Sequence, residues 1–298
     1  MSTLANPALL ASVVDALSTI DAPAISAYEL GKLVYLKGNL SQSESPKSTF
    51  DALQKTLRDV RLIAPLEGSP AFTVFGHTSA LVGEIACCLD PFAYVSHLSA
   101  MEYHGLTDRF PKLLYMTRPT PLDWSKQADA RMDKDLGTHL EHYRQSKLPL
   151  LTRPAITKIR DTVVSFKQRS HMGAFRTVAG SSLRVATIGR VFLDMLREPK
   201  LCGGIQHVLD VYQDHAKPNI RLIVDEFDRH GSGIDKVRAG YVLTELCHLE
   251  HPTIQTWLTK VQRGGSRKLD PDGEFSSNFS ETWKLSLNVP SLMRSAEL

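Results

Sequence analysis

The first 78 residues contain an ordered series of patterns that restricts how the chain can fold. Residues 6–20, 26–36 and 48–63 place apolar side chains at helical spacing, so they predict three amphipathic helices. Residues 63–76 follow with two short apolar runs around Glu67-Gly68-Ser69, which is typical of a β-hairpin. The predicted order is therefore three helices and then a hairpin.

Capping signals support these helix starts. Asn6 precedes Pro7, and Ser26 stands three residues before Glu29 as in a capping box. Three helices followed by a hairpin is the order of a winged helix-turn-helix, in which the third helix enters the DNA major groove and the hairpin forms the wing. We expect a winged helix-turn-helix domain at residues 1–78 and a second domain at 79–298, with the boundary near residues 76–80.

The remaining chain mixes helical and strand patterns. Helices are predicted at 79–90, 95–106, 189–199, 203–215, 220–230 and 236–246, and strands at 112–118, 183–188 and 283–289. Residues 160–169 and 174–180 are interpreted as a strand pair around 170–173, and 263–278 as mostly loop. The predicted fold class is therefore α+β, with a larger mixed α/β C-terminal domain behind the winged helix.

Composition indicates an ordinary globular protein. Of 298 residues, 42% are hydrophobic and 22% charged, which excludes a disordered chain. No apolar run reaches about 18 residues and the first 20 residues lack a signal-peptide pattern, so we expect a cytoplasmic protein without membrane spans. The four cysteines show no C-x-x-C spacing, which favours free thiols.

The stretch from Phe227 to Leu243 resembles the start of a calcium-binding EF-hand loop. With Asp228 at position 1, the third position is His230 and the twelfth is Ala239, where calcium needs an oxygen ligand and a bidentate Glu. The chemistry therefore disfavours calcium. Gly231-Ser232-Gly233 instead predicts a turn between two helices.

Metal and catalytic motifs are weak throughout. His139 with His142 and Cys247 with His251 could each share a helix face, but zinc sites need three or four ligands and neither pair has a clear remote partner. Walker A, G-x-S-x-G, G-x-G-x-x-G and H-E-x-x-H motifs are absent, and no D-x-D pair follows Gly231-Ser232. We expect no catalytic residues, no metal and no cofactor, and hence a protein that is not an enzyme.

The third helix carries the residue types that read DNA. Its N-terminus can bind phosphate, and Gln and Arg on its polar face can form paired hydrogen bonds with base edges. Lysines at and near this helix would dock the backbone, with the wing contacting DNA near its turn. The candidate DNA-binding residues are Lys37, Lys47, Ser48, Thr49, Gln54, Lys55, Arg58 and Ser69.

Charge leaves an alternative open. The net charge of the chain is +3, and residues 1–78 contain six lysines and arginines against seven acidic residues, unlike a strongly basic DNA-binding domain. The alternative is a non-catalytic protein-interaction module whose winged helix does not bind DNA. A nucleotidyltransferase is the third possibility.

Residues 94–246 resemble the C-terminal domain of AbiEi-type antitoxins. The resemblance is carried by YVSHLSAMEYHGLTDRFPKLLYMTRPT, LRVATIGRVFLDML, GGIQHVLDVY and KVRAGYVLTEL, in that order behind the predicted winged helix. Weaker similarity continues in GGSRKLDP and WKLSLNVP. Gly189 stands where the family pattern leads us to expect an acidic residue.

The resemblance implies a DNA-binding transcriptional autorepressor and antitoxin of a bacterial type IV toxin–antitoxin, or abortive-infection, system. Its partners would be promoter DNA with inverted repeats and a nucleotidyltransferase-like toxin. The matching motif residues are Arg190, Asp194, Lys236, Arg238 and Tyr241, with Tyr241 expected to pack inward. An exposed Arg190–Asp194 pair at i, i+4 contributes only about 0.3 kcal/mol, so a solvated or scaffold pair is favoured over a toxin contact.

Overall fold

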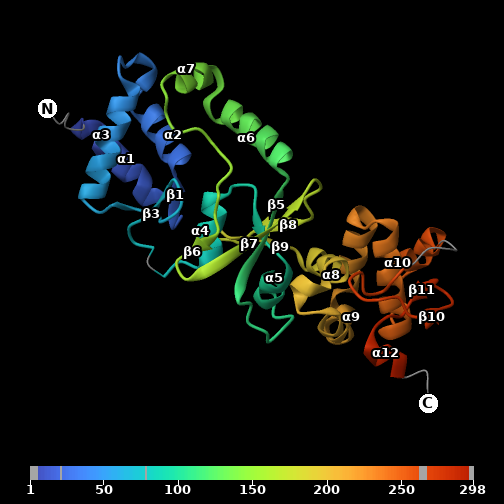
Figure 1. Cartoon of the computed structure of the whole chain (residues 1–298). Coiled ribbons are helices and arrows are strands. Elements are labelled where there is room, and N and C mark those ends of the chain that lie inside the picture. The colour runs from blue at the N-terminus through green and yellow to red at the C-terminus, as the bar shows by residue number, and fades with distance from the viewer. Residues whose placement is uncertain (1–5, 21, 78, 262–266, 295–298) are drawn as a thin grey trace. The chain divides into compact units, whose positions relative to one another are not determined.

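The structure is a computed structural model that describes residues 6–20, 22–77, 79–261 and 267–294 (Figure 1). Helices and several β-sheets are combined, which confirms the predicted mixture of α and β structure. Residue 78, within the predicted domain boundary, and residues 263–266, within the predicted loop, lie outside the described residues.

The chain forms two compact units. Unit 1 contains Met1–Tyr94, Thr117–Met172 and Thr177–Arg184, and unit 2 contains Val95–Met116, Gly173–Arg176 and Val185–Leu298. This division follows spatial compactness, and the sequence boundary at residues 78 and 79 stays a prediction.

Unit 1 begins with helices and a three-stranded sheet. The elements are α1 (Pro7–Thr19), β1 (Ala24–Ser26), α2 (Ala27–Lys37), a 3-10 turn η1 (Leu40–Gln42), α3 (Pro46–Asp59), β2 (Ile63–Pro65) and β3 (Ala71–Val74). Strand β3 pairs antiparallel with both β1 and β2, giving the order β1-β3-β2. The three predicted helices and the hairpin are confirmed, whereas β1 was not predicted.

The caps of α1 and α2 follow the sequence signals. The Asn6 side chain accepts a hydrogen bond from the Ala8 amide at 3.0 Å, and Ser26 Oγ accepts one from the Glu29 amide at 3.1 Å. These bonds satisfy amides that a helix start leaves without intrahelical partners.

Two further helices of unit 1 share the core of the first three. They are α6 (Pro121–Leu136) and α7 (Leu140–Gln145), joined by the 3-10 turn η2 (Gly137–His139). Their Trp124, Met132 and Tyr143 belong to the same buried cluster as Tyr28 and Tyr35 of α2. No helix was predicted at 121–136, so this extension of the core was missed.

The unit 1 core also holds a polar anchor. Trp124 Nε1 donates a hydrogen bond to Oδ1 of the buried Asp90 at 2.9 Å, directly after α4 (Val82–Leu89). Arg118 lies 3.7 Å from the same carboxylate, so the buried charge has a cationic neighbour.

Unit 2 is mainly helical. Its helices are α5 (His97–Tyr103), α8 (Ile188–Arg197), α9 (Ile205–His230), α10 (Gly233–Tyr241), α11 (Pro252–Thr256) and α12 (Pro290–Arg294), and its short turns are η3 (Pro199–Cys202), the π-helical η4 (Val242–Leu246) and η5 (Trp257–Lys260). Strands β10 (Phe279–Ser280) and β11 (Leu285–Ser286) form an antiparallel pair. The two helices expected at 203–215 and 220–230 are one helix of 26 residues with Pro218 inside it.

A six-stranded sheet has the order β6 (Lys158–Ile159), β7 (Thr162–Arg169), β5 (Leu113–Pro119), β4 (Tyr94–Val95), β9 (Arg184–Ala186) and β8 (Phe175–Thr177). The predicted pairing of 160–169 with 174–180 is therefore wrong, because β8 lies beside β9. A turn containing Gly180 at φ +67 closes that local pair, with the Val178 amide donating to the Leu183 carbonyl at 2.9 Å.

The Gly-Ser-Gly segment is the predicted corner between two helices. Ser232 Oγ accepts from the Asp235 amide at 3.4 Å, while the Asp235 carboxylate accepts from the Ser232 amide at 2.8 Å. Arg197 also donates to this carboxylate, at 2.9 and 2.7 Å. The Asp235 side chain therefore caps α10 and pairs with Arg197.

Gly189 permits close packing between α8 and α9. A Cβ at this position would lie 2.2 Å from the Leu222 carbonyl oxygen, far inside contact distance. An acidic side chain, expected from the family pattern, therefore does not fit without moving one helix backbone.

We predict that Gly189→Ala lowers the free energy of unfolding by at least about 2 kcal/mol, because the new methyl group overpacks a helix contact. Thermal and urea unfolding measure the change. The control is Gly233→Ala at the start of α10, where the nearest atom to a new Cβ is 3.9 Å away. Equal stability of the two variants would show that α8 and α9 tolerate a wider spacing.

Candidate nucleic-acid interface

Helix α3 presents a polar face to solvent. Its apolar stripe, Phe50, Leu53 and Leu57, is buried, so the opposite side chains must point outward. Of the predicted contact residues on this helix, Lys47, Ser48, Lys55 and Arg58 are exposed, whereas Thr49 and Gln54 are partly buried. The predicted third helix is therefore present with an exposed polar face, on which Gln54 is less accessible than Arg58.

Acidic neighbours pair with both lysines of this face. Lys47 pairs with Asp51, and Lys55 Nζ lies 2.9 Å from a carboxylate oxygen of Asp59. Exposed i, i+4 pairs contribute only about 0.3–0.5 kcal/mol, so a phosphate can replace either acid as the partner. Within the described ranges, Arg58 has no ion-pair partner.

The N-terminus of α3 has amides available to an anion. Pro46 is its first residue, and the Ser45 side chain makes no capping hydrogen bond. The Thr49 hydroxyl donates to the Ser45 carbonyl at 3.2 Å, so it is already engaged, while Ser48 is exposed. Amides at a helix start together with the helix dipole favour phosphate binding.

Two surface grooves border α3. The first, about 720 Å³, lies beside its N-terminal half and includes Lys47, Lys55 and the sequence-distant Lys147. The second, about 700 Å³, joins the end of α3 to β2 and includes Lys55, Arg58 and Arg61 against the single acid Asp59. The positive charge is therefore concentrated at the C-terminal end of the helix.

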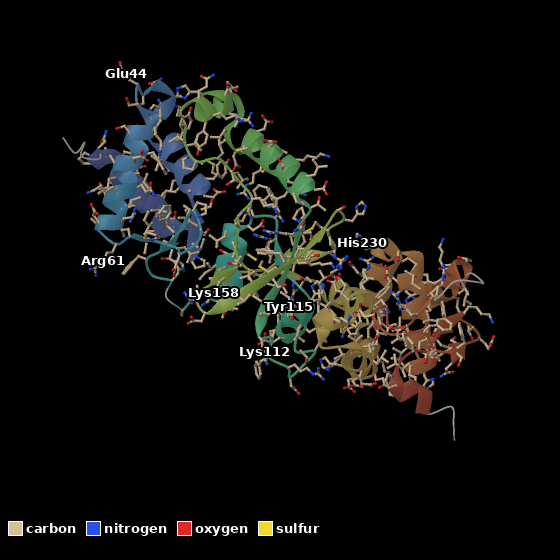
Figure 2. All side chains as sticks on the ribbon, in the orientation of Figure 1. Glu44, Arg61, Lys112, Tyr115, Lys158 and His230 are labelled. Atoms are coloured by element: carbon tan, nitrogen blue, oxygen red, sulfur yellow. The ribbon has the colours of Figure 1, made fainter. Side chains whose placement is uncertain are left out.

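Lys147 and Arg61 were missed as candidate contacts. Arg61 lies just beyond the C-cap Val60 of α3, with φ +59, and Figure 2 shows it and Glu44 near the two ends of this helix. The position of Arg61 two residues after the helix was a usable signal, since phosphate contacts often flank a recognition helix. No local pattern connects Lys147 to α3.

The two remaining DNA candidates flank the helix in sequence. Lys37 is the last residue of α2 and is exposed. Ser69 lies in the β2–β3 loop, where its amide donates to the Leu66 carbonyl at 3.2 Å. The Ser69 hydroxyl, and not its amide, is therefore the group that could contact the DNA backbone.

The antitoxin motif residues lie in unit 2 and have structural partners. Arg190 pairs with Asp194 at 2.9 Å, as the spacing predicted, but both side chains are buried rather than solvated. Lys236 lies 3.1 Å from Asp228, and Arg238 Nε donates to the Lys268 carbonyl at 2.9 Å. Tyr241 is buried, as expected. The side chains of these motif residues are therefore paired, hydrogen-bonded or buried within unit 2.

The two suspected metal pairs also have structural roles. His142 Nδ1 lies 2.9 Å from the Tyr35 hydroxyl, and His139 packs edge-on against the same tyrosine ring. His251 Nδ1 accepts from the Thr253 amide at 3.3 Å, which caps α11. Within the part of the chain that the structure describes, neither pair joins a group of three metal-ligating side chains.

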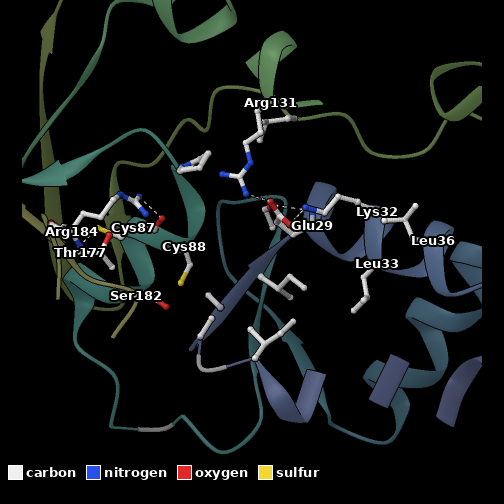
Figure 3. A pocket seen from close by; sticks show the side chains of 17 residues that line it. Glu29, Lys32, Leu33, Leu36, Cys87, Cys88, Arg131, Thr177, Ser182 and Arg184 are labelled. Carbon is white, nitrogen blue, oxygen red and sulfur yellow. Dashed lines mark hydrogen bonds and ion pairs between the residues drawn. The ribbon is translucent and has the colours of Figure 1, made fainter. Parts of the chain in front are cut away.

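A cavity of about 450 Å³ lies inside unit 1 (Figure 3). Its polar wall contains Lys32, which lies 2.7 Å from Glu29, and Arg131, which lies 2.6 Å from Glu29. Burial raises the pKa of the neighbouring Cys87 to about 11, so this thiol is protonated at neutral pH and is a poor nucleophile. The cavity therefore lacks an activated thiol at Cys87.

Comparison with models of known protein families gave no match, and a search of curated proteins found no significantly similar sequence. Among the described helices, none has the length and apolar character needed to cross a bilayer.

We predict a specific acid dependence for Asp135, which lies 2.9 Å from Lys32 of this cavity. Burial alone would raise the pKa of Asp135, but hydrogen bonds from Lys32 and Tyr28 and the charge of Arg131 lower it below its usual value. A carboxyl with a lowered folded pKa stabilises the fold above its unfolded pKa of about 3.9, and that stability is lost as pH falls through the folded value. Asp135→Asn should therefore cost about 1–3 kcal/mol at pH 7, and less below about pH 4.

Unfolding with urea at several pH values measures this effect. The matched control is Asp133→Asn, an exposed position on the same helix, which should change stability by less than about 0.5 kcal/mol at every pH. If Asp135→Asn lowers the free energy of unfolding equally at every pH, the cause is altered packing and not the loss of the charge.

Proposed function

We propose that residues 1–78 form a winged helix that binds duplex DNA, with α3 as the recognition helix. The observation that carries the proposal is the element order α1, β1, α2, α3, β2, β3 together with the sheet order β1-β3-β2. In a winged helix, the helix before the hairpin enters a major groove and the hairpin acts as the wing. The exposed polar face of α3 supports the same assignment.

In the proposed complex, Arg58 reads a base edge, because Arg matches the two acceptors of guanine and this side chain is exposed. Lys47, Lys55 and Arg61 contact phosphates, with the lysines exchanging Asp51 and Asp59 for the DNA backbone. The exchange releases the counterions of the phosphates, so affinity falls steeply as salt rises.

We further propose that the chain is an autorepressor and an antitoxin that counters a nucleotidyltransferase-like toxin. The support is the sequence resemblance to AbiEi-type antitoxins, whose segments fall on α5 and β5, on β9 and α8, on α9 and on α10. In this proposal the buried Arg190–Asp194 pair and the capped α10 stabilise the fold of these segments, and exposed residues of unit 2 contact the toxin.

The alternative is a protein-interaction module whose winged helix does not bind DNA. The pairing of Lys47 and Lys55 with acids on their own helix favours it, because these pairs reduce the positive field that attracts phosphates. A DNA-binding measurement separates the two functions.

We predict that Arg58→Ala weakens binding to the upstream intergenic DNA by about 1–3 kcal/mol, as expected for loss of a base contact. A mobility-shift titration at two salt concentrations measures affinity and its salt dependence. Asp59→Asn should strengthen binding, because it frees Lys55 and removes a negative charge from the interface.

Lys126→Ala is the matched control, since Lys126 is an exposed lysine on α6 of the same unit. Its affinity should equal that of the unchanged protein. Failure of the unchanged protein to bind this DNA at low salt would favour the interaction-module alternative, and equal affinity for Arg58→Ala would remove the base-reading role.

We predict that the gene beside that of this chain encodes a nucleotidyltransferase-like protein, and that co-expression of the chain restores growth to cells that express this protein. Arg58→Ala should keep this protection while losing repression of the promoter, because repression requires DNA contact and toxin control does not. Growth curves and a promoter reporter measure the two effects. Continued toxicity at full expression of the unchanged chain would exclude the antitoxin role.

A further inference from the structure

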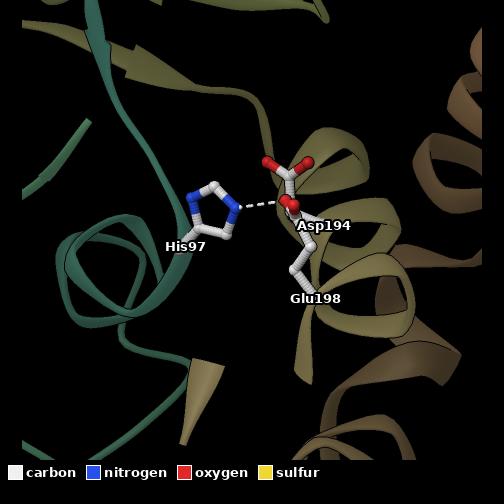
Figure 4. A group of neighbouring side chains, drawn as sticks. All are labelled: His97, Asp194 and Glu198. Atoms are coloured by element: carbon white, nitrogen blue, oxygen red, sulfur yellow. Dashed lines mark hydrogen bonds and ion pairs between the residues drawn. The ribbon is translucent and has the colours of Figure 1, made fainter. Parts of the chain in front are cut away.

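We propose that His97, Asp194 and Glu198 form a binding site for a divalent transition-metal ion, best matched by Zn²⁺, inside unit 2. Each residue offers one ligand atom, and the three atoms lie within 4.8 Å of one another (Figure 4). The sequence did not indicate that these three residues form a group, because His97 is about a hundred residues from the two acids.

The elements of unit 2 bring the donors together. Asp194 lies on α8 and Glu198 directly follows that helix, four residues later, so both carboxylates face one side. His97 begins α5, with the left-handed φ of +51 that turns the chain sharply at this point. Figure 4 shows its ring directed at the two carboxylates.

Hydrogen-bond contacts at both ring nitrogens fix the orientation of His97. Its Nδ1 lies 2.8 Å from the Ser96 hydroxyl, and its Nε2 lies 2.9 Å from Oε2 of Glu198. A hydrogen bond at Nδ1 is the usual outer contact of a metal-ligating histidine, because it fixes the ring and leaves Nε2 for the metal. Ligand bonds of about 2.1 Å would place tetrahedral donors about 3.4 Å apart, so His97 and Glu198 need to separate by only about half an ångström.

Buried negative charge favours a cation here. Asp194 and Glu226 are buried, each with the Arg190 guanidinium within 3.7 Å, and the side chain of Glu198 is mostly buried. Arg190 lies 2.9 Å from Oδ1 of Asp194, and a carboxylate can hold an arginine through one oxygen and a metal through the other. A dication adjacent to these groups would offset charge that is costly to bury.

The donor set indicates the class of metal. One imidazole and two carboxylates suit Zn²⁺, Fe²⁺ or Mn²⁺, whereas Mg²⁺ and Ca²⁺ prefer oxygen ligands throughout. The side chain of Glu198 is 17% exposed, so water can reach the site and complete the coordination. Bound there, the ion would clamp the start of α5 to the end of α8.

The test uses the full chain, first treated with a chelator and then titrated with Zn²⁺ in a calorimeter. We expect one ion per chain and a rise in the unfolding temperature, with much weaker binding of Mg²⁺. Substitution with Co²⁺ should give the visible absorption of a site with nitrogen and oxygen ligands.

Glu198→Gln keeps the shape of the side chain and should reduce Zn²⁺ affinity at least tenfold, as should His97→Gln. His251→Gln is the matched control, since this histidine belongs to the other Cys and His pair of unit 2 and should leave binding unchanged. Because Glu198 is partly exposed, its variant remains informative even if His97→Gln does not fold.

No binding at micromolar Zn²⁺ would overturn the proposal and leave His97 and Glu198 as a structural ion pair. Stoichiometric binding that persists in Glu198→Gln would overturn it equally. Neither result depends on whether α3 binds DNA.

Discussion

The apolar stripe of α3 is the constraint on which the proposed function depends. Phe50, Leu53 and Leu57 are buried, with exposures of 2% or less, so the rotation of the helix about its axis is fixed. A rotation of about 100° per residue then leaves Lys47, Lys55 and Arg58 on the solvent side. The same rotation places Asp51 and Asp59 one turn beyond the two lysines. The burial of this stripe therefore determines that the cations of α3 are exposed and that the two lysines are paired with acids.

Elements with long apolar periodicity could be predicted from the sequence. This holds for α1, α2, α3 and the β9–α8 connection, where the pattern extends over enough residues to distinguish helix from strand. Strand β1, with only Ala24–Ser26, is too short to show an alternation. Two helices were predicted at 203–215 and 220–230, yet one helix continues through Pro218.

The site was predictable only where its contacts are local. The Arg190–Asp194 pair follows from i, i+4 spacing, but its burial depends on α9 and on the close approach of Gly173, which the spacing does not encode. Lys147 reaches the groove beside α3 only because α6 and α7 pack on α2. The His97, Asp194 and Glu198 group likewise depends on tertiary structure, since no metal-ligand spacing in the sequence connects His97 to the two acids.

The hydrogen bond from Trp124 to Asp90 has a spectroscopic consequence. Trp124 is the tryptophan of unit 1, whereas Trp257 and Trp283 belong to unit 2. A chain with phenylalanine at the latter two positions would emit from one indole, held next to a carboxylate and against the Phe92 ring at 5.2 Å. Its fluorescence would then follow the unfolding of the unit 1 core, which also contains the buried side chains of α3. This signal would be separate from unfolding around α8 and α9.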